Sequence, residues 1–187
     1  MERTMSETAS QRLPGDPDAR VLVERIIRVD HAGEYGAKRI YQGQLAVLGR
    51  GPKGDLLRHM QAQEQHHLDT FSALIVKRRV RPTALLPLWH VAGFALGAAT
   101  AALGERAAMA CTVAVEEAID EHYRAQAETL GDDENVLRQT IEEFRAEELE
   151  HRDIGLANEA ERTVGYTLLA RMIKAGCKVA IAVSERV

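Results

Sequence analysis

The chain has 187 residues, with 24 Lys and Arg against 28 Asp and Glu, and a formal net charge of −4. This length suits one domain with a substantial hydrophobic core. Abundant Ala, Leu, Glu and Arg with few prolines favour helices over a sheet. The basic residues are dispersed, which excludes the clustered basic surface of a nucleic-acid-binding protein.

Residues 1–17 contain no apolar signal core and carry several acidic residues, so we expect a disordered lead-in rather than a targeting peptide. Residues 18–187 are expected to form one all-α domain. Apolar periodicity, interrupted by Gly and Pro, predicts helices at about residues 18–48, 54–79, 83–103, 106–130, from the turn at 131–133 to 161, and 166–184.

The third of these segments differs from the others, because residues 83–103 contain no charged side chain and many Gly and Ala. It separates two helical hairpins, one formed by the first two helices and one by the fourth and fifth. The predicted fold is therefore a four-helix bundle built from two hairpins, with an apolar crossover helix and a C-terminal helix added.

Each hairpin carries one copy of the same metal-ligand pattern, a lone Glu followed about thirty residues later by Glu-x-x-His. A Glu and a His three positions apart lie one helical turn apart, so both can reach one metal ion. Four carboxylates and two imidazoles on four helices are the ligands of a carboxylate-bridged two-iron centre, and this donor set suits iron or manganese better than zinc. The candidate ligands are Glu34, Glu64, His67, Glu116, Glu148 and His151.

The repeat also selects among adjacent candidates. His67 is preferred to His66 because only His67 has a Glu three positions before it. Counting back three positions from His151 selects Glu148 among the neighbouring acidic residues.

A tyrosine follows each lone Glu by seven positions, Tyr41 after Glu34 and Tyr123 after Glu116. This spacing also favours Glu116 over Glu117. Seven residues are about two helical turns, so we expect each tyrosine to lie near the ligand face and to hydrogen-bond a ligating carboxylate.

Two other interpretations of the pattern stay open at this point. A ferroxidase or a peroxide-scavenging relative of rubrerythrin would use the same ligands. A helical scaffold without enzymatic activity would carry the Glu-x-x-His pairs on its surface, where single pairs of this kind commonly occur.

From residue 21 onward, nearly the whole chain resembles the demethoxyubiquinone hydroxylases, which are monooxygenases of coenzyme Q biosynthesis. The segments that carry the resemblance are IIRVDHAGEYGA (26–37), RVRPT (79–83), PLW (87–89), GFALG (93–97), ACTVAVEE (110–117), EELEHRDIGL (147–156) and AGC (175–177).

This resemblance implies a ferritin-like bundle with two iron ions (Fe2+/Fe3+) on the six candidate ligands. It also implies hydroxylation of the unsubstituted ring carbon of a polyprenyl methoxy-methyl-benzoquinol, a demethoxyubiquinol, in ubiquinone biosynthesis. O2 is then the co-substrate, and an external two-electron donor is needed, for which NADH is a candidate. Candidate partners besides the prenylated benzoquinol are an accessory lipid-binding protein, other ubiquinone-biosynthesis proteins and a second copy of the chain.

A substrate with an isoprenoid tail lies in a bilayer, so the enzyme must reach a membrane. Residues 83–103 could span one at about 1.5 Å per residue, but spanning would separate two hairpins that share one site. We therefore expect an interfacial helix anchored by Trp89 and Phe94, assisted by the C-terminal helix, on the cytoplasmic side of the cell membrane. A buried crossover helix in an ordinary soluble bundle is the alternative.

Overall fold

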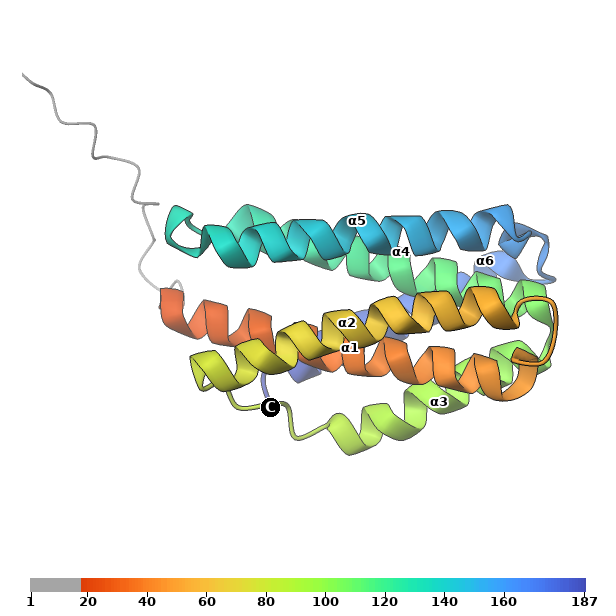
Figure 1. Cartoon of the computed structure of the whole chain (residues 1–187), viewed down its shortest axis with the longest axis horizontal. Helices are drawn as coiled ribbons and strands as arrows, with labels where there is room; N and C mark the ends of the chain where they lie inside the picture. Colours follow the sequence, from red (N-terminus) through yellow and green to blue (C-terminus); the bar gives the residue numbers. More distant parts are fainter. Residues whose placement is uncertain (1–17) are drawn as a thin grey trace, which may run out of the picture.

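The computed structural model describes residues 18–187, and the expected lead-in at residues 1–17 lies outside this range. Residues 18–187 contain helices and no strand (Figure 1). The six α-helices are α1 (Ala19–Leu48), α2 (Gly54–Arg78), α3 (Leu86–Ala102), α4 (Glu105–Thr129), α5 (Asn135–Ala157) and α6 (Tyr166–Ser184). Two short 3-10 helices, η1 (Asp132–Glu134) and η2 (Ala160–Arg162), flank α5.

Two predicted helix boundaries are wrong. The helix expected from residue 83 begins at Leu86, and Pro87 lies in its first turn. Proline is tolerated there because the first N–H groups of a helix make no hydrogen bond within the helix. The helix expected to reach residue 161 ends at Ala157. There the Asn158 side chain donates to the Ile154 carbonyl at 2.7 Å, and Glu159 takes a left-handed conformation with φ 62° that turns the chain away.

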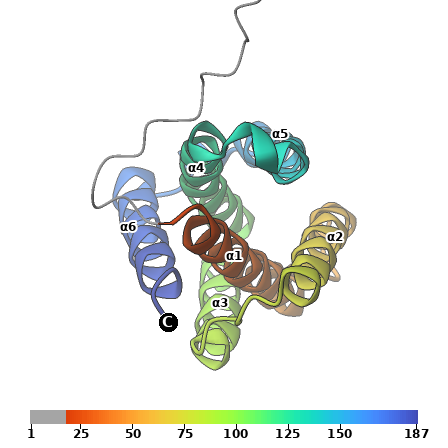
Figure 2. The ribbon, with the colours of Figure 1, turned by 90° about the vertical axis from the view of Figure 1, so that its left-hand side faces the viewer.

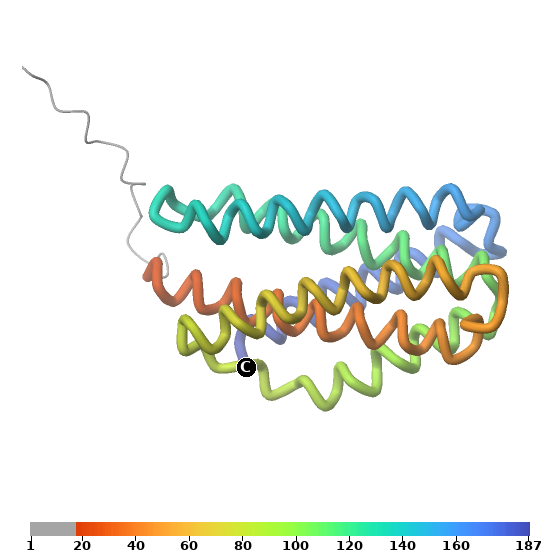
Figure 3. The backbone as a smooth tube through the Cα atoms, in the orientation of Figure 1, coloured from red at the N-terminus to blue at the C-terminus, as the bar shows by residue number. Residues whose placement is uncertain are grey.

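The helices form the two predicted hairpins, α1 with α2 and α4 with α5 (Figure 1). The α1–α2 turn and the α4–α5 turn lie at opposite ends of the molecule (Figure 3). The hairpins are therefore antiparallel to each other, as a pseudo-two-fold repeat requires. In the end view, α3 packs along α1, and α6 packs against α4 and α1 (Figure 2). This all-helical arrangement is consistent with a ferritin-like bundle.

The apolar core of the described residues forms three clusters, two at the ends of the bundle and one that joins α1 and α4 to α6. One end cluster joins the starts of α1 and α5 to the ends of α2 and α4, and it includes Ile27, Phe71 and Ile141. A second cluster, at the α1–α2 turn, includes Leu57, Met60 and Met109. Between these clusters the bundle buries a layer of charged side chains. The apolar ends thus hold four helices together around an interior that is polar.

The contact between α1 and α3 is made by backbone against backbone. Gly97 of α3 faces the Ile40 carbonyl, and Gly93 faces the Gly36 carbonyl. Gly43 of α1 in turn faces the Phe94 carbonyl. A Cβ atom at any of these positions would clash with the opposite backbone, so glycine is required for the two helices to approach this closely.

We expect Gly97→Ala to destabilise the fold by about 1–3 kcal/mol, the range for overpacking a closely packed contact. Gly176→Ala is the matched control, because a Cβ atom added at that exposed helical position meets no atom within 4 Å. The control should raise stability by up to about 1 kcal/mol through helix propensity. Denaturant unfolding of the two variants and the parent measures both effects, and equal stability of the two variants would contradict the backbone contact.

Candidate metal centre

The six predicted ligand side chains converge in the charged layer at the middle of the bundle. Each is at most 1% exposed. They come from four helices, with one Glu each from α1 and α4 and one Glu-x-x-His pair each from α2 and α5. The residues brought together are Glu34, Glu64, His67, Glu116, Glu148 and His151.

These side chains form two overlapping groups of four, and within each group one ligand atom per residue lies within 4.8 Å of the others. Glu34 and His67 belong only to the first group, and Glu116 and His151 only to the second. The remaining two carboxylates are shared by both groups. The arrangement could therefore hold two cations side by side, with two shared carboxylates and one Glu and one His at each end.

Both histidines direct Nδ1 toward the centre. His67 Nδ1 lies 3.2 Å from Glu148 Oε1 and 3.4 Å from Glu34 Oε2. His151 Nδ1 lies 3.2 Å from Glu64 Oε1 and 3.4 Å from Glu148 Oε2. The Glu148 carboxylate therefore stands between the two imidazoles, with one oxygen facing each.

The opposite ring nitrogens contact two residues that sequence reasoning missed. His67 Nε2 lies 2.9 Å from Glu147 Oε2, and His151 Nε2 lies 3.0 Å from Gln63 Oε1. When each Nε2–H donates to these oxygens, each Nδ1 presents its lone pair to the centre, as a metal-binding imidazole does. The repeat carries the signal for this pair, because Gln63 and Glu147 each directly precede the Glu of a Glu-x-x-His motif.

The two tyrosines bond across the hairpins. Tyr41 donates from α1 to Glu116 Oε1 on α4 at 2.9 Å, and Tyr123 donates from α4 to Glu34 Oε1 on α1. The prediction that each tyrosine bonds a candidate carboxylate agrees with this geometry, and the structure adds that each tyrosine reaches the Glu of the other copy. Each lone Glu is therefore oriented by the opposite hairpin.

Aromatic rings enclose the imidazoles. The Phe144 ring is stacked on the His67 ring with centroids 4.0 Å apart, and Tyr41 meets His151 edge-on at 6.0 Å. These contacts restrict ring rotation and leave the centre little access to water.

The neighbouring residues that the repeat rejected as ligands lie outside the buried cluster. His66 and Glu150 are exposed, and Glu117 is half-exposed and pairs with Lys174 of α6.

Burial and crowding shift the protonation of these groups. Burial raises the pKa of Glu34, Glu64 and Glu116, and the charge of Glu148 adds to each rise. Burial lowers the pKa of His67, but its contacts with Glu148 and Glu34 outweigh this and raise it to about 12. The pKa of Glu148 falls to about 2, because His151 and His67 outweigh the effect of burial. Each carboxylate of the cluster therefore opposes the ionisation of its neighbours, and the imidazoles favour it.

The cluster also fits a cation through the atoms it leaves without partners. Carboxylate oxygens and imidazole nitrogens directed inward have no hydrogen-bond donor or acceptor to satisfy them, which is costly for buried polar groups. A pair of divalent cations would satisfy these atoms. The unpartnered atoms belong to all six side chains: Glu34 Oε2, both oxygens of Glu64, His67 Nδ1, Glu116 Oε2, both oxygens of Glu148, and His151 Nδ1.

Comparisons with known proteins identify the family of the chain. Residues 21–184 match the family model described as ubiquinone biosynthesis protein COQ7. The chain is 63% identical to the 3-demethoxyubiquinol 3-hydroxylase of Rhodospirillum rubrum over 97% of its own length and 86% of that protein. It is 54% identical to the human NADPH-dependent 3-demethoxyubiquinone 3-hydroxylase, mitochondrial, over 98% of its length and 87% of the human protein. Identity to the yeast 5-demethoxyubiquinone hydroxylase, mitochondrial, is 43%, covering 89% and 78%.

We expect metal-free protein to be stabilised against heat by Mn2+, used here as a redox-inert probe. Binding at one hundred times the dissociation constant adds about 2.7 kcal/mol to the unfolding free energy per site. Calorimetry should show a higher midpoint for the parent and for Glu150→Ala. Glu148→Ala should show little change, because the carboxylate it loses belongs to both groups. A parent midpoint that does not respond to Mn2+ would contradict a cation site.

Proposed function

The chain belongs to the family of the ubiquinone biosynthesis protein COQ7, and we propose that it acts as a 3-demethoxyubiquinol 3-hydroxylase. In this reaction one oxygen atom of O2 replaces the ring hydrogen of a prenylated benzoquinol. The observation that carries the proposal is the buried cluster of four Glu and two His in a chain 63% identical to a hydroxylase of that name. Residues 18–187 act as a single ferritin-like domain around this cluster.

Two iron ions are the proposed metals, because a donor set rich in carboxylates with one imidazole per metal suits iron. Glu34 and His67 would hold one ion, and Glu116 and His151 would hold the other. Glu64 and Glu148 belong to both groups and could contribute to either ion. When bound, a pair of reduced iron ions would supply electrons with which O2 is activated.

The surrounding side chains keep these ligands in position for the reaction. Tyr41 and Tyr123 donate to Glu116 and Glu34, which fixes the rotation of each carboxylate. Gln63 also donates to Glu147 at 3.4 Å, so the two residues that orient the imidazoles are joined to each other. This network lets the protein set ligand geometry before substrate arrives, and the aromatic rings exclude water.

The two electrons that hydroxylation consumes come from outside the chain. The human relative is named NADPH-dependent. We propose a reduced nicotinamide, NADH or NADPH, as the donor for this chain as well.

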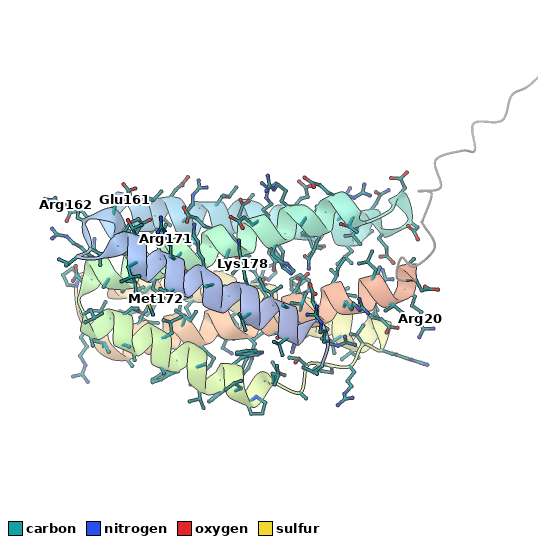
Figure 4. All side chains as sticks on the ribbon, turned by 180° about the vertical axis from the view of Figure 1, so that it is seen from behind. Arg20, Glu161, Arg162, Arg171, Met172 and Lys178 are labelled. Carbon is teal, nitrogen blue, oxygen red and sulfur yellow. The ribbon has the colours of Figure 1, made fainter. Side chains whose placement is uncertain are left out.

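The helices α3 and α6 supply the proposed membrane surface. On α3, Leu88 and Val91 are 54% and 65% exposed, and on α6, Met172 and Val179 are 65% and 62% exposed. Figure 4 shows α3 and α6 on the same face, with Met172 on α6 labelled there. The helices are joined at one end, where Trp89 Nε1 donates to Ser184 Oγ at 3.0 Å. The indole N–H of Trp89 is therefore engaged within the protein.

Among residues 18–187, no helix is both long and apolar enough to cross a bilayer. We therefore propose peripheral binding, with the apolar side chains of α3 and α6 inserted into the interface. The yeast and human relatives are named mitochondrial. For this chain we propose the cytoplasmic face of the cell membrane, where a lipid-binding accessory protein, other ubiquinone-biosynthesis proteins or a second copy could assist substrate transfer.

Ligand and neighbour substitutions test the function in a strain that lacks this chain. The strain should accumulate the demethoxy precursor, and the parent chain should reverse this. Glu116→Ala and Glu148→Ala should abolish the reversal while helical content stays near that of the parent. Glu117→Ala and Glu150→Ala should retain most of it, because these side chains are at least partly exposed and lie outside the cluster. Lipid extraction with mass spectrometry gives the ratio of precursor to product.

Equal loss in all four variants would show that the ligand assignment is wrong. A deletion strain that does not accumulate the demethoxy precursor would exclude the proposed substrate. Fully soluble protein that oxidises free Fe2+ rapidly and forms no hydroxylated quinol would favour the ferroxidase interpretation instead.

The membrane surface has its own test, flotation with vesicles of phosphatidylcholine and phosphatidylglycerol. Val91→Gln with Met172→Gln should weaken vesicle binding by roughly tenfold or more, since burial of each apolar side chain contributes about 1.5–3 kcal/mol. Val136→Gln is the control, because Val136 is 76% exposed on α5, away from the proposed surface. Equal binding by the double variant and the control would exclude α3 and α6 as the contact.

A further inference from the structure

A second buried polar group lies one helical turn from Glu34, outside the six ligands. Asp30 on α1 is 2% exposed, and its Oδ1 accepts from Gln126 Nε2 on α4 at 2.7 Å. His122 Nε2 lies 3.4 Å from the same oxygen and 2.8 Å from Gln126 Nε2. Asp30 Oδ2 has no hydrogen-bond partner. The His122 side chain is 16% exposed, so this group connects the interior with solvent.

Asp30 and His122 each stand near a residue at the Glu34 end of the metal centre. Asp30 and Glu34 are four residues apart and therefore share one face of α1. His122 directly precedes Tyr123, whose hydroxyl donates to Glu34. Burial, followed by the charges of Glu34 and Asp30, raises the pKa of Tyr123.

The pseudo-two-fold repeat has no such acid at its other end. The counterpart of Gln126, ten positions after the lone Glu, is Gln44, whose Nε2 lies 3.4 Å from Thr112 Oγ1. Thr112 stands four positions before Glu116, where Asp30 stands before Glu34. The counterpart of His122 is Ile40. A neutral hydroxyl and an alkyl group thus fill the places that an acid and an imidazole fill at the Glu34 end.

Packing alone does not explain a carboxylate at this position. Burial raises the pKa of Asp30, and His122 and Gln126 only partly offset the rise. The charge of Glu185, at the end of α6, opposes ionisation further. A neutral residue, as at Thr112, would avoid this cost. A group retained at a cost to stability is a candidate for a functional role.

The proposed reaction supplies a role, because it consumes a proton. Ring C–H, O2, NAD(P)H and one H+ give ring C–OH, water and NAD(P)+. One oxygen atom forms the new C–O bond, the nicotinamide hydride supplies two electrons, and the second oxygen atom leaves as water. The proton must come from solvent to a centre that is at most 1% exposed.

Resting on the proposed hydroxylase function, we propose that Asp30 and His122 form a proton-transfer pair that delivers this proton from solvent to the Glu34 end of the metal centre. In the resting arrangement Gln126 donates to Asp30 and to the lone pair of His122 Nε2. When the partly exposed His122 ring takes a proton from solvent on Nε2, that proton passes to Asp30 Oδ1, the oxygen 3.4 Å away, and His122 returns to its neutral form. Protonated Asp30 then holds the proton one helical turn from Glu34, at the end of the metal centre that receives it.

The first test measures turnover of iron-loaded protein with quinol, NAD(P)H and O2. Asp30→Asn keeps the shape of the side chain and should lower the rate roughly tenfold or more, with a new solvent deuterium isotope effect and unchanged iron content. His122→Ala should lose a similar factor and regain activity with added imidazole, which can occupy the partly exposed position. Imidazole should not restore Asp30→Asn. Thr112→Val, the matched change at the other end, should behave as the parent does.

A second test uses metal-free protein and does not depend on the enzymatic function. Because the folded-state pKa of Asp30 is raised, ionisation costs stability above the ordinary Asp range and costs nothing well below it. Asp30→Asn should therefore unfold at an equal or higher denaturant midpoint than the parent near pH 7.5, with the difference shrinking as the pH falls toward 4.

Any of three results would overturn the proton pair. The first is a lower midpoint for Asp30→Asn at pH 7.5, which would make Asp30 a structural residue. The second is full turnover by Asp30→Asn, and the third is no rescue of His122→Ala by imidazole. Failure of the parent to form hydroxylated product is a distinct outcome, since it would reject the proposed function while the unfolding test still decides whether Asp30 stabilises the fold.

Discussion

The rest of the structure depends on the burial of four carboxylates and two imidazoles in one polar layer. Charges of like sign in an interior of low polarity repel strongly and are poorly solvated, so they need either protons or cations to offset them. The apolar clusters at the two ends of the bundle supply the free energy that makes this layer tolerable. The fold therefore holds a group that opposes folding, and this is the expected condition of a metal centre.

The two hairpins make this layer jointly. Tyr41 orients the lone Glu of the second hairpin, and Tyr123 orients that of the first. Gln63 and Glu147 contact the histidines of the opposite hairpin in the same reciprocal manner. The residues that orient the ligands are therefore the same in kind in both copies of the repeat. One helical turn away the two copies differ, because the first Glu has Asp30 and His122 beside it and the second has Thr112 and an aliphatic residue.

Much of this centre was predictable from the sequence, because a spacing of three residues on a helix determines which side chains share a face. That rule selects His67 over His66 without knowledge of the fold. The crossing of the tyrosines was not predictable, since seven residues advance about 10 Å along a helix and carry the hydroxyl past its own Glu. Gln63 and Glu147 were missed because each lies about 100° round the helix from the Glu that follows it, and only the packing of α2 near α5 gives them a role. The early end of α5 depends on the Asn158 side chain, which no periodicity reveals.

The crossover helix α3 has a consequence for how the enzyme could meet lipid. Because α2 ends at the opposite end of the molecule from the start of α4, the chain must travel the length of the bundle before the second hairpin can begin in the reversed direction (Figure 3). A connecting segment of this length is thus demanded by topology. The same segment carries exposed Leu88 and Val91 and lies with its glycines against α1. The membrane surface that we propose therefore coincides with a connection that the chain path already requires.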